Sequence, residues 1–157
     1  MAKLQLVTAN KEARAPRVRT SPKPVAIDHQ PVLEAKDHFI TRNGLTFAGS
    51  HLIIDLWEAS GLDDRDRIEK ALIDAVNAAG ATLLHIHLHT FTEGGGISGV
   101  AVLAESHISV HTWPERGYAA FDVFMCGDAD PKKALSVFKR AFKPGRMVVG
   151  EHRRGVL

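Results

Sequence analysis

Hydrophobic and polar residues alternate along several segments beyond residue 44, while two other segments repeat apolar residues every three to four positions. Alternation is typical of a strand with one buried face, and the longer period is typical of an amphipathic helix. Up to residue 37 no sustained period is present, and prolines are frequent. The pattern predicts strands at residues 50–58, 81–91, 98–105, 107–113, 118–126 and 146–152.

The helical pattern occurs twice. Residues 63–80 begin with acidic side chains, as the first turn of a helix favours, and end at Gly80, which is placed as a C-cap. A second helix is predicted to open at Asp130 as N-cap, with Pro131 at the first helical position. Each helix has one apolar face, formed in the first by Ile68, Ala71, Leu72, Ala75, Val76 and Ala79 and in the second by Ala134, Leu135, Phe138, Ala141 and Phe142.

The order of these elements is β-α-β-β-β-β-α-β, and most strands are joined by connections too short for a crossover helix. We therefore expect an α+β fold, a two-layer sandwich in which a largely antiparallel β-sheet carries both amphipathic helices on one face. Residues 100–104 and 119–125 are apolar at successive positions, which indicates burial on both faces of the sheet. The second face is therefore expected to form a homodimer.

The excess positive charge of the chain lies before this predicted domain. Residues 1–37 hold seven Lys or Arg against four Asp or Glu, which leaves 13 against 14 in residues 38–157. We interpret residues 1–37 as a flexible, mildly basic N-terminal extension and residues 38–157 as a single domain. Because the domain has no basic stripe, no nucleic-acid partner is expected.

Other compositional features point to a cytoplasmic protein. No run of 18 or more apolar residues is present, so no membrane segment is expected. The first residues lack the apolar core of a secretory signal. Cys126 is the single cysteine, which excludes an internal disulfide and fits a reducing compartment.

Three histidines, His85, His87 and His89, recur at period two and are predicted to project from one face of a strand. Such spacing can present imidazoles to a metal ion. No Cys or carboxylate accompanies them at ligand spacing, which favours histidines that are half-exposed or hydrogen-bonded. We predict no metal site, and a metal-binding dimeric module remains an alternative of another class.

Residues 103–115 hold the densest reactive side chains of the chain. Ser106 lies in no nucleophile elbow, so a conventional serine hydrolase is not expected. Its hydroxyl can instead reach the carbonyl of Glu105 through a five-membered ring, turning the peptide into an ester. Removal of the Ser106 Cα proton would then expel the Glu105 carboxylate. His111 and Ser98 could supply the base and the oxyanion donor if the strands bring them together.

Residues 97–127, ISGVAVLAESHISVHTWPERGYAAFDVFMCG, also resemble the core signature of bacterial S-adenosylmethionine decarboxylase proenzymes, the pyruvoyl-dependent enzymes of spermidine synthesis. The similarity extends more weakly over residues 45–155. It implies cleavage between Glu105 and Ser106, leaving a β chain of residues 1–105 and an α chain of residues 106–157. The pyruvoyl cofactor would derive from Ser106, form a Schiff base with the substrate and allow carbon dioxide to leave.

The resemblance assigns further roles by position. Ser98 and His111 would be processing residues, and Cys126, which by itself reads more readily as a small buried residue, would be the catalytic proton donor. Phe91, Trp113 and Glu115 would bind the adenine and ribose of S-adenosylmethionine, the last two across the dimer interface. Processed αβ protomers would thus form a homodimer with shared active sites.

The substrate is the part of this assignment with a close alternative. The loop before Ile97 reads FTEGGG, with an added glycine and Glu93 where many members carry a proline. Some relatives of this fold decarboxylate ornithine or arginine with the same pyruvoyl chemistry. The presence of Phe91, Trp113 and Glu115 favours S-adenosylmethionine. A non-catalytic dimeric binding module that is never processed is the alternative outside enzymes.

Overall fold

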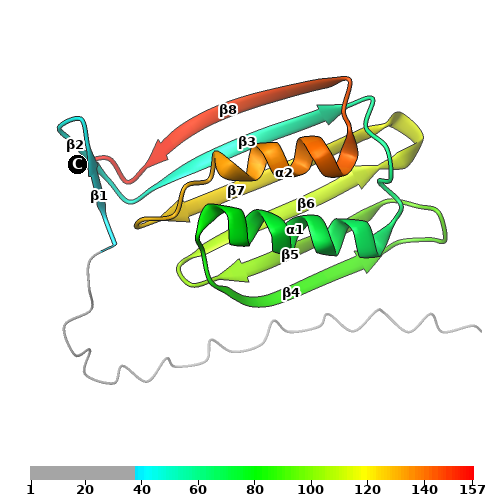
Figure 1. Ribbon diagram of the computed structural model, residues 1–157, viewed down its shortest axis with the longest axis horizontal. Helices are drawn as coiled ribbons and strands as arrows, with labels where there is room; N and C mark the ends of the chain where they lie inside the picture. Colours follow the sequence, from blue (N-terminus) through cyan, green and yellow to red (C-terminus); the bar gives the residue numbers. More distant parts are fainter. Residues whose placement is uncertain (1–37) are drawn as a thin grey trace, which may run out of the picture. The chain divides into compact units, whose positions relative to one another are not determined.

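Six strands form one antiparallel sheet in the computed structural model, which describes residues 38–157. The extension predicted for residues 1–37 lies outside the described residues. The strand order is β4-β5-β6-β7-β3-β8, and every neighbouring pair is antiparallel (Figure 1). The bounds are β3 Gly49–Trp57, β4 Leu83–Thr90, β5 Ile97–Leu103, β6 Ser106–Trp113, β7 Tyr118–Cys126 and β8 Arg146–Arg154.

Two helices, α1 (Arg65–Ala79) and α2 (Lys133–Phe142), lie side by side on one face of this sheet (Figure 1). This arrangement confirms the expected two-layer α+β sandwich. The first helix has the expected ends: the Asp64 side chain accepts a hydrogen bond from the backbone N–H of Arg67, and Gly80 adopts the left-handed φ of 76° that a C-cap requires.

The second helix begins later than predicted. Asp130 is not its N-cap, because regular α-helix starts only at Lys133. The Asp130 side chain instead accepts a hydrogen bond from the backbone N–H of Lys132, and its carbonyl accepts one from Lys133. Asp130 and Pro131 therefore form a turn that leads into the helix. Asp130 accepts hydrogen bonds from backbone N–H groups of this turn instead of capping the helix.

The core lies between the helices and the sheet. Phe121 of β7 stacks on Phe138 of α2, with ring centroids 4.3 Å apart, and lies 5.5 Å from the ring of Phe142. The apolar faces predicted for the helices point into this layer, where most of their members are buried. Aromatic stacking therefore connects the strand that carries Cys126 to the helix layer.

A short hairpin before the sheet was not predicted. It consists of β1 (Ile40–Arg42), β2 (Leu45–Phe47) and the turn residues Asn43 and Gly44, whose φ values are 52° and 76°. Asn-Gly with two positive φ values is the usual chemistry of a two-residue hairpin turn. This dipeptide was the available signal, and the strands it joins are too short to show a period.

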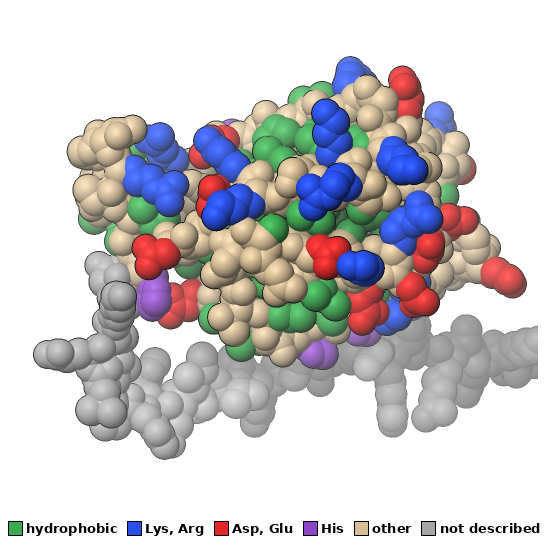
Figure 2. All heavy atoms as spheres, viewed as in Figure 1, with side chains coloured by type: hydrophobic (Ala, Val, Ile, Leu, Met, Phe, Trp, Pro, Cys, Tyr) green, Lys and Arg blue, Asp and Glu red, His purple; other side chains and the backbone are tan. Residues whose placement is uncertain are grey.

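The sheet face away from the helices carries a concentration of imidazoles. Alternation along the strands and the pairing of β3 with β7 and β8 place seven of the nine histidines on this face, which we call the open face. They are His51, His85, His87, His89, His107, His111 and His152. Figure 2 views the opposite, helix-covered side, where acidic and basic side chains are interspersed.

Truncating the aromatic stack should destabilise the fold. Phe121 is 1% exposed, so Phe121→Ala removes a buried ring and leaves a cavity, and we expect a loss of about 3–5 kcal/mol in the free energy of unfolding. Leu84→Ala, at a side chain that is 64% exposed, is the matched control and should cost far less. Urea denaturation measures both, and equal losses would contradict the packing described.

Candidate functional site

Glu105 lies in the tight turn between β5 and β6 with a φ of 59°. A residue with a Cβ pays roughly 1–2 kcal/mol for this left-handed conformation. The strained residue is the one on the acyl side of the Glu105–Ser106 bond, and its carbonyl oxygen accepts a hydrogen bond from the Cys126 thiol. The bond expected to break thus has a donor on its oxygen and strain at its acyl residue.

Ser106 and Cys126 meet because β6 begins where β7 ends. The Ser106 Oγ lies 3.6 Å from the Cys126 Sγ and accepts a hydrogen bond from the Cys126 backbone N–H at 3.3 Å. Ser106 is buried, with 9% of its surface exposed. Sheet register therefore brings together a hydroxyl, a thiol and the Glu105 carbonyl, three of the groups expected from the sequence.

Ser98 and His111 form a second pair. They are direct cross-strand partners on β5 and β6, and the Ser98 Oγ lies 2.7 Å from the His111 Nδ1. Both side chains lie on the open face. The pair has the components of a hydroxyl and a base in hydrogen-bond contact.

These two pairs are not close to each other within one chain. Ser106 and His111 are five residues apart on the same strand, which corresponds to about 17 Å at the antiparallel rise per residue. General acid–base transfer needs contact at hydrogen-bond distance or through one water. The strands therefore do not bring His111 and Ser98 to the Glu105–Ser106 bond of their own chain.

An aromatic cluster occupies the same end of the sheet as Ser98 and His111. Trp113 stacks on Tyr118 with ring centroids 5.2 Å apart, and the ring centroids of Trp57 and Tyr118 are 4.4 Å apart. Trp113 is 40% exposed and Phe91 63% exposed, so each presents a ring face or edge to solvent. Glu115 is in the 3-10 helix η1 (Pro114–Arg116) that follows Trp113.

Tyr118 is a member of this cluster that the sequence analysis missed. Its hydroxyl donates a hydrogen bond to Asp55 at 2.6 Å. That bond, followed by burial and the negative charges of Asp55 and Asp122, raises the pKa of Tyr118 to about 12. The phenol therefore stays protonated at neutral pH. Tyr118 lies four residues before Asp122 and eight residues before Cys126 on the same strand. Even spacings put side chains on one face of a strand, so this was the signal that could have placed all three on the open face.

Polar groups also fill the middle of the open face. The Ser109 hydroxyl donates to Asp122 at 3.0 Å, and the His51 Nε2 lies 3.4 Å from the other Asp122 oxygen, an ion pair only when His51 is protonated. Burial and the nearby His51 lower the pKa of His107, while Asp122 raises it by a smaller amount. The arrangement favours a neutral His107.

The histidines of β4 project as predicted. Their cross-strand partners are His85 with Val102, His87 with Val100 and His89 with Ser98, and all three imidazoles are exposed on the open face. Within residues 38–157, no group of three or more His, Cys, Asp or Glu side chains is arranged to hold a metal ion. In the same part of the chain, no helix is long and apolar enough to cross a membrane.

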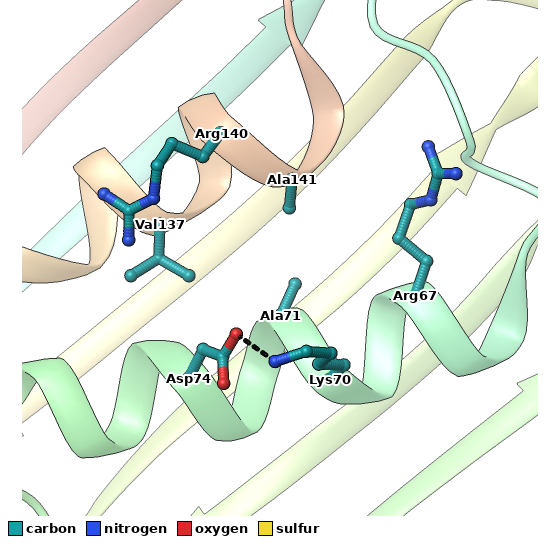
Figure 3. A pocket seen from close by; sticks show the side chains of 7 residues that line it. All are labelled: Arg67, Lys70, Ala71, Asp74, Val137, Arg140 and Ala141. Carbon is teal, nitrogen blue, oxygen red and sulfur yellow. Dashed lines mark hydrogen bonds and ion pairs between the residues drawn. The ribbon is translucent and has the colours of Figure 1, made fainter.

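One pocket lies away from these groups, between α1 and α2 (Figure 3). Figure 3 shows Arg67 and Arg140 extending from different helices, with Lys70 held by Asp74 through a 2.7 Å ion pair. Its floor is formed by small apolar side chains, Ala71, Val137 and Ala141. The pocket belongs to the helix layer, whereas the side chains of Cys126, Ser98 and His111 belong to the opposite side of the sheet, so it is not the candidate site.

Comparison with known proteins agrees with this chemistry. The sequence model of a protein family described as S-adenosylmethionine decarboxylase matches residues 50–155. A protein of Methanococcus maripaludis (strain C7), named S-adenosylmethionine decarboxylase proenzyme, is 48% identical over 112 residues, which cover 69% of this chain and 91% of that protein. A protein of the same name from Thermomicrobium roseum is 44% identical over 110 residues, covering 69% of this chain and 95% of its own length.

A solved structure shares the fold as well. The crystal structure of the adenosylmethionine decarboxylase from Aquifex aeolicus VF5 aligns with a TM-score of 0.62 at 34% identity, covering 71% of this chain and 93% of that one. The resemblance expected from residues 97–127 is thus confirmed at the level of the sequence family and of the fold. The chain belongs to the S-adenosylmethionine decarboxylase family.

Proposed function

We propose that this chain is a decarboxylase proenzyme that cleaves itself between Glu105 and Ser106 and then acts on S-adenosylmethionine. The observation that carries the proposal is the turn in which Cys126 contacts both the Glu105 carbonyl and the Ser106 hydroxyl. The two relatives are named as proenzymes, which supports a processing step.

The cleavage begins with attack of the Ser106 Oγ on the Glu105 carbonyl carbon. The Oγ–C bond forms, the C–N bond breaks, and the hydroxyl proton passes to the amine of Ser106, giving an ester. The Cys126 thiol, which donates to the carbonyl oxygen, stabilises the charge that develops there. The left-handed φ of Glu105 destabilises the uncleaved turn, and this strain is released when the later elimination separates Glu105 from residue 106.

Elimination then separates the two chains. A base removes the Ser106 Cα proton, the Cβ–O bond breaks, and Glu105 leaves as a carboxylate, the new end of a β chain of residues 1–105. The unsaturated amine at the start of residues 106–157 tautomerises to an imine, and water hydrolyses it to a pyruvoyl group and ammonia. The three carbons of this cofactor come from Ser106, its ketone oxygen comes from water, and tautomerisation adds a solvent proton to its methyl group.

The pyruvoyl group supplies a carbonyl for the substrate amine and an electron sink for the departing carboxylate. Cys126 lies beside Ser106, the residue from which the pyruvoyl group forms. As a thiol, Cys126 can return a proton to the substrate α-carbon. This role needs a reduced cysteine, as the cytoplasm maintains. The product keeps the sulfonium and its aminopropyl chain, the donor needed for spermidine synthesis.

The exposed rings support S-adenosylmethionine as the substrate. Phe91 and Trp113 present aromatic surface on which an adenine base can stack, and the sulfonium charge favours an electron-rich ring face. The carboxylate of Glu115 is available for the ribose hydroxyls. Ornithine and arginine have no purine to stack, so this surface would contribute less to their binding than to that of S-adenosylmethionine.

The active site is proposed to be shared between two copies of the chain. Within one chain the cleavage turn and the Ser98–His111 pair lie about 17 Å apart along β6. Each chain therefore holds two separate half-sites that cannot act on each other. In a two-fold dimer formed through the open faces, the cleavage turn of one copy can meet the other half from its partner. The open face carries exposed apolar side chains, including Ile53, Val102 and Val148, that such an interface would cover.

Processing can be tested by intact mass spectrometry. We expect two fragments that separate after Glu105, with the smaller one blocked by pyruvoyl in place of a free amine, instead of one chain of 17.1 kDa. Ser106→Ala removes the nucleophile and should leave the chain whole. A wild-type chain that also stays whole after prolonged incubation would support the non-catalytic binding module instead.

Sharing of the site can be tested with two variants that each fail alone. Ser106→Ala lacks the nucleophile and His111→Ala lacks the base, so neither should cleave as a homodimer. When they are co-expressed, the mixed dimer has one site with an intact Ser106 and an intact His111 from different chains. We expect the His111→Ala chain to be cleaved there, as its mass will show. If it stays whole, the site is not shared.

Decarboxylation can be tested on the processed protein. Cys126→Ala removes the proton donor, and we expect the rate of carbon dioxide release per processed chain to fall about 100-fold or more. The assay compares S-adenosylmethionine, ornithine and arginine, and activity restricted to an amino acid without adenine would contradict the substrate proposed.

Adenine stacking can be tested separately. Trp113→Ala should raise KM for S-adenosylmethionine with a smaller effect on kcat, because stacking stabilises the bound substrate as well as the transition state.

A further inference from the structure

His38 contacts both chain segments that carry the reacting groups. Its Nε2 lies 3.1 Å from the Glu105 Oε2, and its backbone carbonyl accepts a hydrogen bond from the Gly127 N–H at 3.1 Å. Glu105 directly precedes Ser106, and Gly127 directly follows Cys126. One residue therefore connects the turn to be cleaved with the end of the strand that carries the thiol.

Both contacts fall on residues with left-handed backbone. Glu105 has a φ of 59° and Gly127 a φ of 62°. The conformation is unfavourable for Glu105, which has a Cβ, so an added interaction is needed to keep it populated. The contact to the Glu105 carboxylate supplies one. Since that conformation directs the Glu105 carbonyl to the Cys126 thiol, the contact acts on the geometry of the cleaved bond.

The position of His38 is itself held by neighbouring structure. The β1–β2 hairpin follows it directly, and the end of that hairpin is attached to the last strand and the C-terminus by backbone hydrogen bonds from Ala48 to Arg154 and from Leu157 to Thr46. Within the hairpin, the hydroxyls of Thr41 and Thr46 are 3.0 Å apart. His38 is thus at the anchored base of a small folded unit, rather than on a free strand end.

The hairpin and His38 precede residues 50–155, the part of the chain that the family model matches. The side chains of His38 and Glu105 are 45% and 55% exposed, so their interaction is partly screened by water. Such a pair contributes little to global stability, and a larger effect is expected only where it biases one strained turn.

We infer that His38 is a positioning residue for self-cleavage. Its imidazole Nε2 holds the carboxylate of Glu105 so that the carbonyl of the same residue stays on the Cys126 thiol while Ser106 attacks. This inference rests on the proposed processing reaction and adds to it a residue that precedes the matched residues 50–155. His38 acts through Glu105 and touches none of the bonds that break or form.

The test measures the first-order rate constant of cleavage in freshly made full-length precursor. His38→Ala should slow cleavage about twofold to fivefold, the range expected when one half-exposed pair is removed. His38→Lys keeps an N–H donor on a side chain that can reach Glu105 and should restore most of the rate. Thr41→Ala, which removes a hydroxyl contact in the same hairpin, is the matched control and should leave the rate unchanged.

A second measurement separates positioning from folding. In the uncleavable Ser106→Ala background, His38→Ala and His38→Lys should have melting temperatures close to that of the parent. Equal cleavage rates for wild type and His38→Ala overturn the inference. So does a rate loss that Lys does not restore, because a donor to the Glu105 carboxylate would then be irrelevant. If the wild-type precursor never cleaves, the proposed function itself fails, which is a distinguishable result.

Discussion

The antiparallel register of β6 between β5 and β7 is the constraint on which the candidate chemistry depends. It sets Ser106 against the end of β7, where Cys126 is, and sets His111 opposite Ser98. A slip by one residue would move every side chain of β6 to the other face of the sheet. The buried alternation of Ile108 and Val110 against the helix layer makes such a slip costly. Ordinary core packing thus controls the geometry of the reactive groups.

The length of that strand has an equally direct effect. Because β6 carries Ser106 at its first position and Trp113 at its last, the cleavage turn and the aromatic cluster lie at opposite ends of one sheet. A two-layer sandwich covers only one face of the sheet with helices, so the face that carries His111 and Cys126 is left for a partner. The length of β6 thus separates the two half-sites, and the uncovered face of the sheet is the surface through which two copies of the chain could join them.

Strain and support are combined at the cleavage turn. Glu105 has a left-handed backbone, and its carbonyl and carboxylate are held by two different segments, at Cys126 and at His38. Strain at a functional position persists only where surrounding structure maintains it. Here the packed strand β7, joined to the helices by the Phe121 stack, provides the rigid side of that support. The hairpin before the sheet provides the other.

Much of the fold and part of the site follow from sequence pattern. Successive side chains of a strand point to opposite faces, so the strand predicted at residues 118–126 places Cys126 on the same face as Tyr118 and Asp122. The apolar repeat of residues 63–80 predicts α1 and its buried face. The start of α2 was predicted wrongly, since Asp130 can cap a preceding turn as well as a helix. The β1–β2 hairpin was missed because three-residue strands have no period to detect.

By itself, the sequence determined which reactive residues are present and which face of its strand each one occupies. Only the tertiary structure decided which of them meet. The contact of Ser106 with Cys126 spans twenty residues and that of His38 with Glu105 spans 67, and pairing at such distances depends on strand order and register. It also decided that His111, close to Ser106 in sequence, is far from it in space, because an extended strand carries neighbouring residues apart.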